Sequence, residues 1–199
     1  MEWRHEGCDR VIETSYNNIL NSHFCKYCDS GLNQRALHCV AEYIFDQRFK
    51  AEKRIWDVFP EDRDIFHQLT SLDSYAPLNL YMSDGTQIKL ALERQGRQHE
   101  DTQGGYNYYL EMNGLQDSPH SYKAWRRLIQ NDRNKVEVFR KHNTDGYFLI
   151  IVRHNIPRWR MQKYIYQVFK EKLLEYGEVI DIDEKPHFNV DKFLSQLDD

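Results

Sequence analysis

The sequence predicts an α/β protein in which a mixed central sheet is flanked by helices. Three observations predict this class. Apolar residues recur at helical spacing in three segments, a turn signal joins two strand-like segments, and a continuous apolar run lies between Gly146 and Arg153. The chain has 199 residues, 40% of them hydrophobic and 14% aromatic, which is enough to bury a full core. We therefore expect one main domain with a small appendage.

The cysteines mark the N-terminal appendage, since all four lie within the first 39 residues. Disulfides are unusual inside cells, so clustered thiols favour metal binding. Two close pairs, His5-x2-Cys8 and Cys25-x2-Cys28, match the ligand spacing of a closed tetrahedral zinc site. His23 is an alternative to His5 as the histidine ligand. A set of ordinary reduced thiols is the other interpretation.

This spacing predicts two domains, a zinc finger over residues 1–32 and a larger α/β domain over residues 33–199. The larger domain begins with an amphipathic helix, predicted over residues 34–49. Glu42 falls among the core-facing positions of that helix, which is an unusual place for an acid. The neighbouring pair His38-Cys39 is interpreted as part of the core.

A β-hairpin carries two acids of special interest. One strand is predicted over residues 69–82, Ser83-Asp84-Gly85-Thr86 is a turn signal, and the partner strand is predicted over residues 87–94. Pairing of the two strands brings Asp73 and Glu93 side by side. Two adjacent carboxylates suit a divalent metal, Mg²⁺ or Mn²⁺, that activates water against a phosphodiester.

The remaining elements follow from composition and periodicity. The polar segment 100–121, rich in Gly and Asn, is predicted to be a long loop, and residues 122–142 an amphipathic helix. The apolar run 147–152 is predicted to be a buried central strand. A third amphipathic helix is expected from Pro157 to about Tyr176, and the end of the chain is acidic.

Four segments of the larger domain carry a resemblance to a known superfamily. They are Leu72-Asp73-Ser74-Tyr75, Leu90-Ala91-Leu92-Glu93-Arg94-Gln95-Gly96-Arg97-Gln98-His99, Asp132-x2-Lys135 and Phe148-Leu149-Ile150-Ile151. Together they resemble the PD-(D/E)xK nucleases, and more narrowly the group in which such a domain follows a treble-clef zinc finger. The resemblance runs from Trp3 to about Arg153 and implies a restriction-endonuclease-like fold.

The resemblance also implies roles for the matched residues. Asp73 and Glu93 would bind a catalytic divalent metal, and Glu42 matches the helix glutamate that often completes the site. Gln95 stands where the lysine of the E-x-K signature is usual. Because glutamine is neither a cation nor a general base, it would only orient water or donate a hydrogen bond to phosphate. That departure puts more weight on the metal, or on Lys135 reaching the site.

Gln98 and His99 would line the cleft beside the metal. The candidates also have plainer interpretations, since strand-terminal acids are commonly solvated and Glu42 would pair equally well with a nearby Arg or Lys. Asp132 and Lys135, three positions apart, are explained at least as well by an ion pair on the helix surface.

Charge is distributed unevenly along the chain, although the net charge is only −4. The segment 123–141 has a strong excess of basic residues, including Arg126, Arg127 and Arg133, whereas the chain from Glu171 onward is mainly acidic. A basic middle and an acidic end are expected of a protein that grips phosphates on one side. These arginines are therefore candidate DNA-binding residues, with a solvated helix face as the alternative.

The expected function is that of a metal-dependent DNA endonuclease whose zinc finger aids substrate binding. The alternative is a catalytically weak or inactive nuclease-fold module that binds nucleic acid within a larger defence, mobile-element or repair assembly. Symmetric double-strand cutting would favour a homodimer. No apolar run approaches the length of a membrane span and no signal-peptide core is visible, so we expect an intracellular protein, cytoplasmic or in the nucleoid or nucleus.

Overall fold

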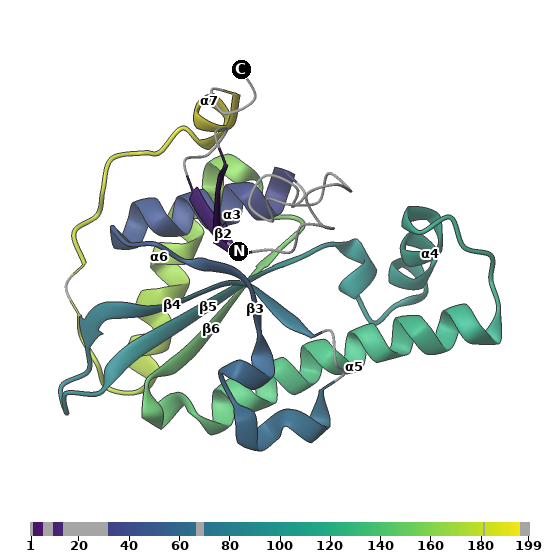
Figure 1. Cartoon of the computed structure of the whole chain (residues 1–199), viewed down its shortest axis with the longest axis horizontal. Coiled ribbons are helices and arrows are strands. Elements are labelled where there is room, and N and C mark those ends of the chain that lie inside the picture. The colour runs from purple at the N-terminus through teal and green to yellow at the C-terminus, as the bar shows by residue number, and fades with distance from the viewer. Residues whose placement is uncertain (1, 6–9, 14–31, 67–69, 181, 196–199) are drawn as a thin grey trace.

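The structure is a computed structural model and describes residues 2–5, 10–13, 32–66, 70–180 and 182–195. Figure 1 shows a twisted central sheet with helices packed around it. This arrangement confirms the predicted class, an α/β fold with a mixed sheet flanked by helices. Among the described residues, no helix combines the length and the apolar character needed to cross a membrane.

The N-terminal zinc finger stays a prediction. Strands β1 (Glu2–His5) and β2 (Arg10–Glu13) pair antiparallel near the start of the chain. Of the proposed zinc ligands, only the backbone of His5 belongs to this hairpin. The other ligands and the alternative histidine lie outside the described residues: Cys8, His23, Cys25 and Cys28.

The central sheet has the strand order β3–β4–β5–β6. Neighbouring strands are antiparallel from β3 to β5, whereas β5 and β6 run parallel, so the sheet is mixed as predicted. The strands are β3 (Lys50–Arg54), β4 (Ser71–Tyr81), β5 (Gln87–Gln95) and β6 (Tyr147–Arg153).

The β4–β5 hairpin forms close to its predicted limits. Its turn is closed by two backbone hydrogen bonds, from the amide of Gly85 to the carbonyl of Met82 and from the amide of Met82 to the carbonyl of Thr86, both 2.9 Å. Gly85 has φ of +86°, a left-handed conformation that glycine adopts without strain. The turn places Tyr81 opposite Gln87, and an irregularity between Pro77 and Tyr81 then shifts the register, so that Ser74 faces Leu92.

One face of the sheet is covered by α3 (Leu32–Phe45) and α6 (Arg158–Glu175), and α7 (Val190–Ser195) packs on both helices. Alternate strand residues point to this face and form the main core, in which Leu90 and Ile150 are fully buried. This alternation is the reason why the apolar residues of α3 and α6 find a matching surface.

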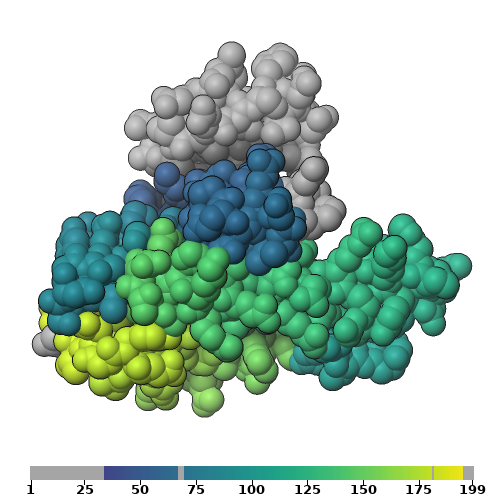
Figure 2. All heavy atoms as spheres, turned by 90° about the horizontal axis from the view of Figure 1, so that it is seen from below, coloured from purple at the N-terminus to yellow at the C-terminus, as the bar shows by residue number. Residues whose placement is uncertain are grey.

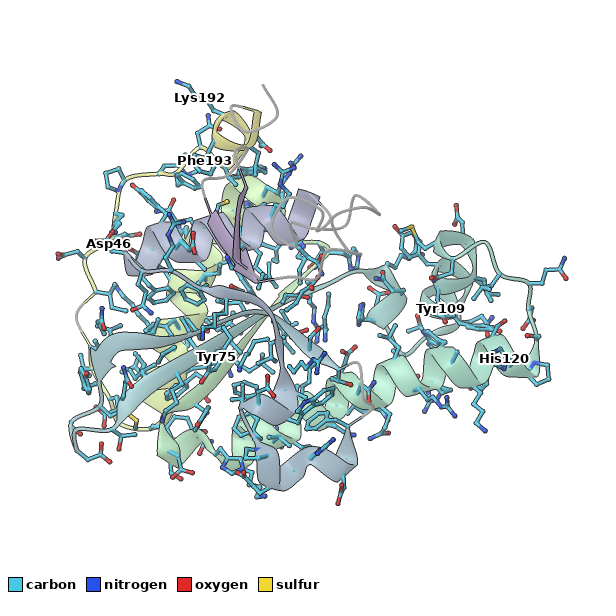
Figure 3. The ribbon with its side chains drawn as sticks, viewed as in Figure 1. Asp46, Tyr75, Tyr109, His120, Lys192 and Phe193 are labelled. Atoms are coloured by element: carbon cyan, nitrogen blue, oxygen red, sulfur yellow. The ribbon has the colours of Figure 1, made fainter. Side chains whose placement is uncertain are left out.

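The opposite face is covered by α5 (Pro119–Lys141) and two short 3₁₀ helices, η1 (Ile55–Asp57) and η2 (Pro60–Ile65). The intervening residues of the strands, such as Leu149, form a second core with these helices. Tyr75 of β4, labelled in Figure 3, packs against this second core. The sheet is therefore buried on both sides.

The prediction of a central strand over residues 147–152 is wrong, because β6 lies at the edge of the four-stranded sheet. The apolar run reflects burial of side chains on both faces, where α5 and α6 cover it. It carries no information about whether the backbone pairs with one neighbouring strand or two. β6 is therefore an apolar strand with an outer backbone edge.

Two predictions near α3 also need correction. The predicted helix 34–49 ends early, at Phe45, because Asp46 adopts a left-handed conformation with φ of +52°. The chain then enters β3, a strand that the sequence did not indicate. Four of the five residues in β3 are charged, so the period of two that marks a half-buried strand is hidden.

The predicted loop over residues 100–121 is likewise wrong, since it contains α4 (Gln103–Met112). The side chain of Thr102 caps this helix by accepting a hydrogen bond from the amide of Gly105. Tyr106 of α4 packs with Trp125 and Ile129 of α5 in a separate small core. The loop prediction failed because the polar, Gly-rich composition conceals a helix that buries only a narrow strip.

We call α4 and residues 119–130 of α5 the arm. Figures 1 and 2 show the arm extending away from the sheet, well beyond the main body of the protein. Tyr109 of α4 and His120 near the start of α5 are labelled on it in Figure 3. The predicted helices 122–142 and 157–176 agree closely with α5 and α6.

The main core predicts a clear stability difference between two positions of α6. Phe169 is fully buried and packs against Phe45 and Phe148, whereas Leu174 on the same helix is 60% exposed. We expect Phe169→Ala to lower the free energy of unfolding by about 3–5 kcal/mol, because it leaves a cavity. Leu174→Ala, the matched control, should change it by less than about 0.5 kcal/mol. Urea denaturation measures both; equal losses would contradict the assigned core.

Candidate active site

The register of β4 and β5 places the two predicted metal-binding acids next to each other. Ser74 faces Leu92 in the antiparallel ladder, so the preceding residue Asp73 lies opposite Glu93. The backbone amide of Asp73 is 3.3 Å from Oε1 of Glu93, and the backbone amide of Arg94 donates to Oδ2 of Asp73 at 2.6 Å. The sequence prediction that the hairpin brings these two acids together is confirmed.

Lys135 reaches the same place from α5. Its Nζ donates to Oε2 of Glu93 at 2.8 Å, and both side chains are buried, with Lys135 8% and Glu93 5% exposed. The interpretation of Asp132 and Lys135 as an ion pair on the helix surface is therefore wrong. Lys135 turns inward to Glu93, whereas Asp132 turns to a different partner.

That partner is His99, in the short 3₁₀ helix η3 (Arg97–His99) that follows β5. Nδ1 of His99 lies 2.6 Å from Oδ2 of Asp132, and both side chains are largely buried. A neutral His99 that donates from Nδ1 to this carboxylate leaves Nε2 unprotonated. The structure thus brings together a histidine–aspartate pair beside the carboxylates.

The electrostatics of the cluster are dominated by burial. Burial raises the pKa of Glu93; the charge of Lys135 opposes this shift and that of Asp73 adds to it. Burial also raises the pKa of Asp73, against the lowering effect of its hydrogen bond from Arg94. Burial alone would lower the pKa of Lys135, but the charge and hydrogen bond of Glu93 outweigh it and raise that pKa. Two acids thus lie next to each other with little water around them, so binding of a further positive charge beside them is favourable.

Gln34 is a site residue that sequence reasoning missed. Its Nε2 donates to Oδ1 of Asp73 at 2.9 Å, and one helical turn later Nδ1 of His38 lies 3.0 Å from the hydroxyl of Ser74. Gln34, His38 and Glu42 are spaced by four residues, so they form a polar line along α3. That spacing was the available signal that this edge of α3 faces the polar start of β4.

Glu42 itself is not brought to the carboxylate pair. Its Oε1 accepts a hydrogen bond from the backbone amide of Phe49 at 2.9 Å, and Oε2 lies 3.3 Å from Nη1 of Arg48. These contacts hold the turn between α3 and β3. The expectation that Glu42 completes the metal site therefore has no geometric support, and the pairing with a nearby arginine describes it better.

A pocket of about 370 Å³ opens beside the cluster, at the end of β5 and β6. It is lined by Gln95, Gly96, His99, Asp101, Arg153 and His154, among others. Gln95 and His99 thus reach a space large enough for a small group such as a phosphate. Gln98, which was expected to line the cleft, does not line this pocket, and its carbonyl accepts a hydrogen bond from Nε1 of Trp125 at 2.9 Å.

The predicted DNA-binding arginines lie on α5. Arg126 and Arg133 both pair with Asp101, and Arg127 is exposed on the arm. Asp101 therefore offsets part of the positive charge next to the pocket. The hydrogen bond between Trp125 and Gln98 ties the arm directly to the segment that carries His99.

A second group of potential metal ligands lies elsewhere, at the far end of α5. Glu61, Asp62 and His142 place ligand atoms within 4.8 Å of one another. Asp62 already accepts hydrogen bonds from Lys141 at 2.8 Å and pairs with His142 at 2.9 Å. The hydrogen bond from Lys141 lowers the pKa of Asp62, so this group acts as a salt-bridge network that holds η2 to α5.

Comparison of the chain with protein-family models, curated proteins and solved structures found no match in any of the three.

The buried ion pair generates a test of the site's architecture. We expect Lys135→Met to lower the free energy of unfolding by about 3–5 kcal/mol at neutral pH, because Glu93 is left buried beside Asp73 without its counter-charge. Adding Glu93→Gln to that variant should recover most of the loss, since the unpaired acid is then gone. Urea denaturation of the wild type, both single variants and the double variant gives the coupling energy. Additive effects of the two changes would contradict the pair.

Proposed function

We propose that this protein is a metal-dependent DNA endonuclease of the PD-(D/E)xK type. The observation that carries the proposal is the convergence of Asp73, Glu93 and Lys135 at one end of the sheet. Two acids and a lysine are the side chains that the E-x-K signature assembles. Here Lys135 comes from α5 and lies next to Glu93 in space. Gln95 occupies the sequence position where the signature normally has its lysine. Lys135 thus supplies to the cluster the positive charge that Gln95 lacks.

The donor set suits Mg²⁺ or Mn²⁺. Asp73 and Glu93 offer hard carboxylate oxygens side by side, and their burial makes an extra positive charge favourable. Asp73 and Glu93 would hold the ion, with Gln34 and the amide of Arg94 fixing the orientation of Asp73. When bound, such a metal lowers the pKa of water and neutralises charge that develops on the phosphate.

His99 and Asp132 supply a route for the proton in this proposal. Water attacks phosphorus and its proton passes to Nε2 of His99, while the bridging P–O bond breaks and the leaving oxygen takes up a proton from solvent. Asp132 holds the ring by its contact with Nδ1 and stabilises the positive charge that forms on the ring. His99 is then a catalytic residue and Asp132 a positioning residue.

The arm supports DNA as the substrate, because it presents exposed cations away from the acidic end of the chain. Arg127 and Lys123 are exposed there, and Arg126 and Arg133 pair with Asp101. Asp101 in turn lines the pocket. Phosphates of a duplex would replace Asp101 as partners of these arginines at little cost, since the ion pairs are solvent-accessible.

A second candidate function is a nuclease-fold module that binds nucleic acid without cutting it. The observation that favours it is the direct hydrogen bond from Lys135 to Glu93, because the lysine already balances the charge of the acid that a metal would use. Under this alternative the arm and the pocket still bind nucleic acid, but no cleavage occurs.

Cleavage of supercoiled plasmid separates the two functions. We expect nicking in the presence of Mg²⁺ or Mn²⁺ and its loss in EDTA, because the carboxylate pair acts through a divalent ion. Glu93→Ala should reduce the rate at least about 100-fold while plasmid binding persists. Glu171→Ala, at an exposed acid of α6 that does not line the pocket, serves as the control and should cut at the wild-type rate. Metal-independent binding with no cleavage by the wild type would instead establish the binding module.

The role of His99 is tested by chemical rescue. We expect His99→Ala to lower kcat by about 100- to 10,000-fold, with partial recovery when imidazole is added, because the missing group transfers a proton. Asp132→Asn should lower kcat without recovery in imidazole, since its defect is the orientation of a ring that is still present. Plasmid-nicking rates measured against imidazole concentration provide the readout. A His99→Ala enzyme as fast as the wild type would exclude the proton-transfer role.

The proposed zinc finger requires a separate measurement. We expect one tightly bound Zn²⁺ per chain in purified protein, held by Cys8, Cys25, Cys28 and either His5 or His23. Cys25→Ser should lower the zinc content from about one ion per chain to nearly none, because removing a thiolate ligand weakens zinc binding strongly. Cys39→Ser is the matched control and should keep the ion, since Cys39 packs partly buried against the main core. Elemental analysis decides; an unchanged zinc content in Cys25→Ser would reject this ligand set.

A further inference from the structure

A groove runs along the outer edge of β6, between the two helices that cover opposite faces of the sheet. It encloses about 430 Å³ and is lined by residues of β6, α5 and α6. Val136, Leu149 and Val168 are among the apolar residues that line it. The proposed nuclease reaction uses none of these three residues.

The backbone of β6 offers hydrogen-bonding groups to this groove. The carbonyl of Gly146 accepts from the amide of Lys89 on β5, at 2.7 Å, so the residues that alternate with it from Phe148 onward face β5. Leu149 and Ile151 therefore present their amides and carbonyls to the outer side. The hydroxyl of Tyr164 on α6 donates to the carbonyl of Ile151 at 3.0 Å, which agrees with this direction.

The groove has a positive lining. Arg140 of α5, Arg153 at the end of β6 and Lys172 of α6 line it, against the single acid Glu175. One end of the groove is closed, because Asn143 after α5 donates a hydrogen bond to the hydroxyl of Tyr176 after α6. The other end leads to Arg153, which also lines the pocket beside His99.

We propose that this groove binds an extended, acidic peptide segment of a partner protein, which adds to the sheet as a strand beside β6. An exposed strand edge is a template for pairing with another chain, and soluble proteins normally cover or charge such edges. Main-chain hydrogen bonds to the amide and carbonyl of Leu149 and to the amide of Ile151 would supply affinity, since the carbonyl of Ile151 already accepts from Tyr164. Alternate side chains of the peptide would lie against α5 and α6, where apolar and acidic residues are both complementary.

The same observations argue against two other occupants. A second copy of this chain joined edge to edge would bring the positive lining of the groove against itself, and like charges disfavour that contact. A single-stranded nucleic acid would match the positive charge, but it has no row of amides and carbonyls to pair with the edge of β6. The peptide uses both the charge and the backbone edge.

The experiment measures binding of a fluorescein-labelled heptapeptide, alternating valine and glutamate, to the full chain by fluorescence anisotropy. We expect saturable binding that Lys172→Glu weakens about five- to tenfold, since a favourable charge contact becomes repulsive. Lys170→Glu is the matched control and should bind as the wild type does, because Lys170 is exposed on the same helix but does not line the groove. The peptide should also slow hydrogen exchange of the amides in residues 147–153.

A second peptide separates strand pairing from charge. Methylation of alternate backbone nitrogens along one edge keeps the side chains and removes the amides that pair, so we expect this peptide to lose binding. The proposal is overturned if the unmodified peptide fails to bind at millimolar concentration, or if Lys170→Glu weakens binding as much as Lys172→Glu. Displacement of the peptide by oligothymidylate, or a dimer that dissociates when the peptide binds, would assign the groove to the other occupants. None of these outcomes depends on whether the protein cuts DNA.

Discussion

The ion pair between Glu93 and Lys135 joins the sheet to the helix that covers it, and the arrangement of the site depends on this contact. Both groups leave water when the chain folds, which costs several kcal/mol for each ion unless a close partner compensates. The 2.8 Å contact provides that partner. Because the pair fixes how far α5 lies along the sheet, it also fixes Asp132, less than one helical turn earlier, opposite His99.

The groups around this pair interact unfavourably with it. Asp73 adds a second negative group beside Glu93, and burial raises the pKa of both acids. A cluster built only for stability would replace one acid by an apolar side chain, since such replacements are often neutral or stabilising. Instead, Gln34 and the amide of Arg94 hold Asp73 in place. Local rules of folding are violated here in the way expected of functional sites.

The sequence was informative wherever a pattern is local. The turn at Gly85 predicted the hairpin and so the proximity of Asp73 and Glu93, whereas their exact pairing depends on a register shift between Pro77 and Tyr81 that the turn does not set. The sequence left two directions open for Lys135, toward the site or toward Asp132 on the helix surface, because the choice depends on where α5 crosses the sheet. β3 and α4 were missed because charged or Gly-rich residues hide their periodicity. The edge position of β6 was not predicted for another reason. Apolar side chains indicate that both faces of a strand are buried, but they do not indicate whether its backbone pairs with one neighbouring strand or two.

The length of α5 has a consequence for how a duplex would be held. One unbroken helix of 23 residues carries both the exposed Lys123 of the arm and the buried Lys135. At 1.5 Å per residue, these two lysines are separated by roughly 18 Å along the helix axis. Successive base pairs are about 3.4 Å apart, so the distance between the two lysines corresponds to about five of them. The length of α5 would then set the distance between the phosphates bound by the arm and the phosphate at the carboxylates.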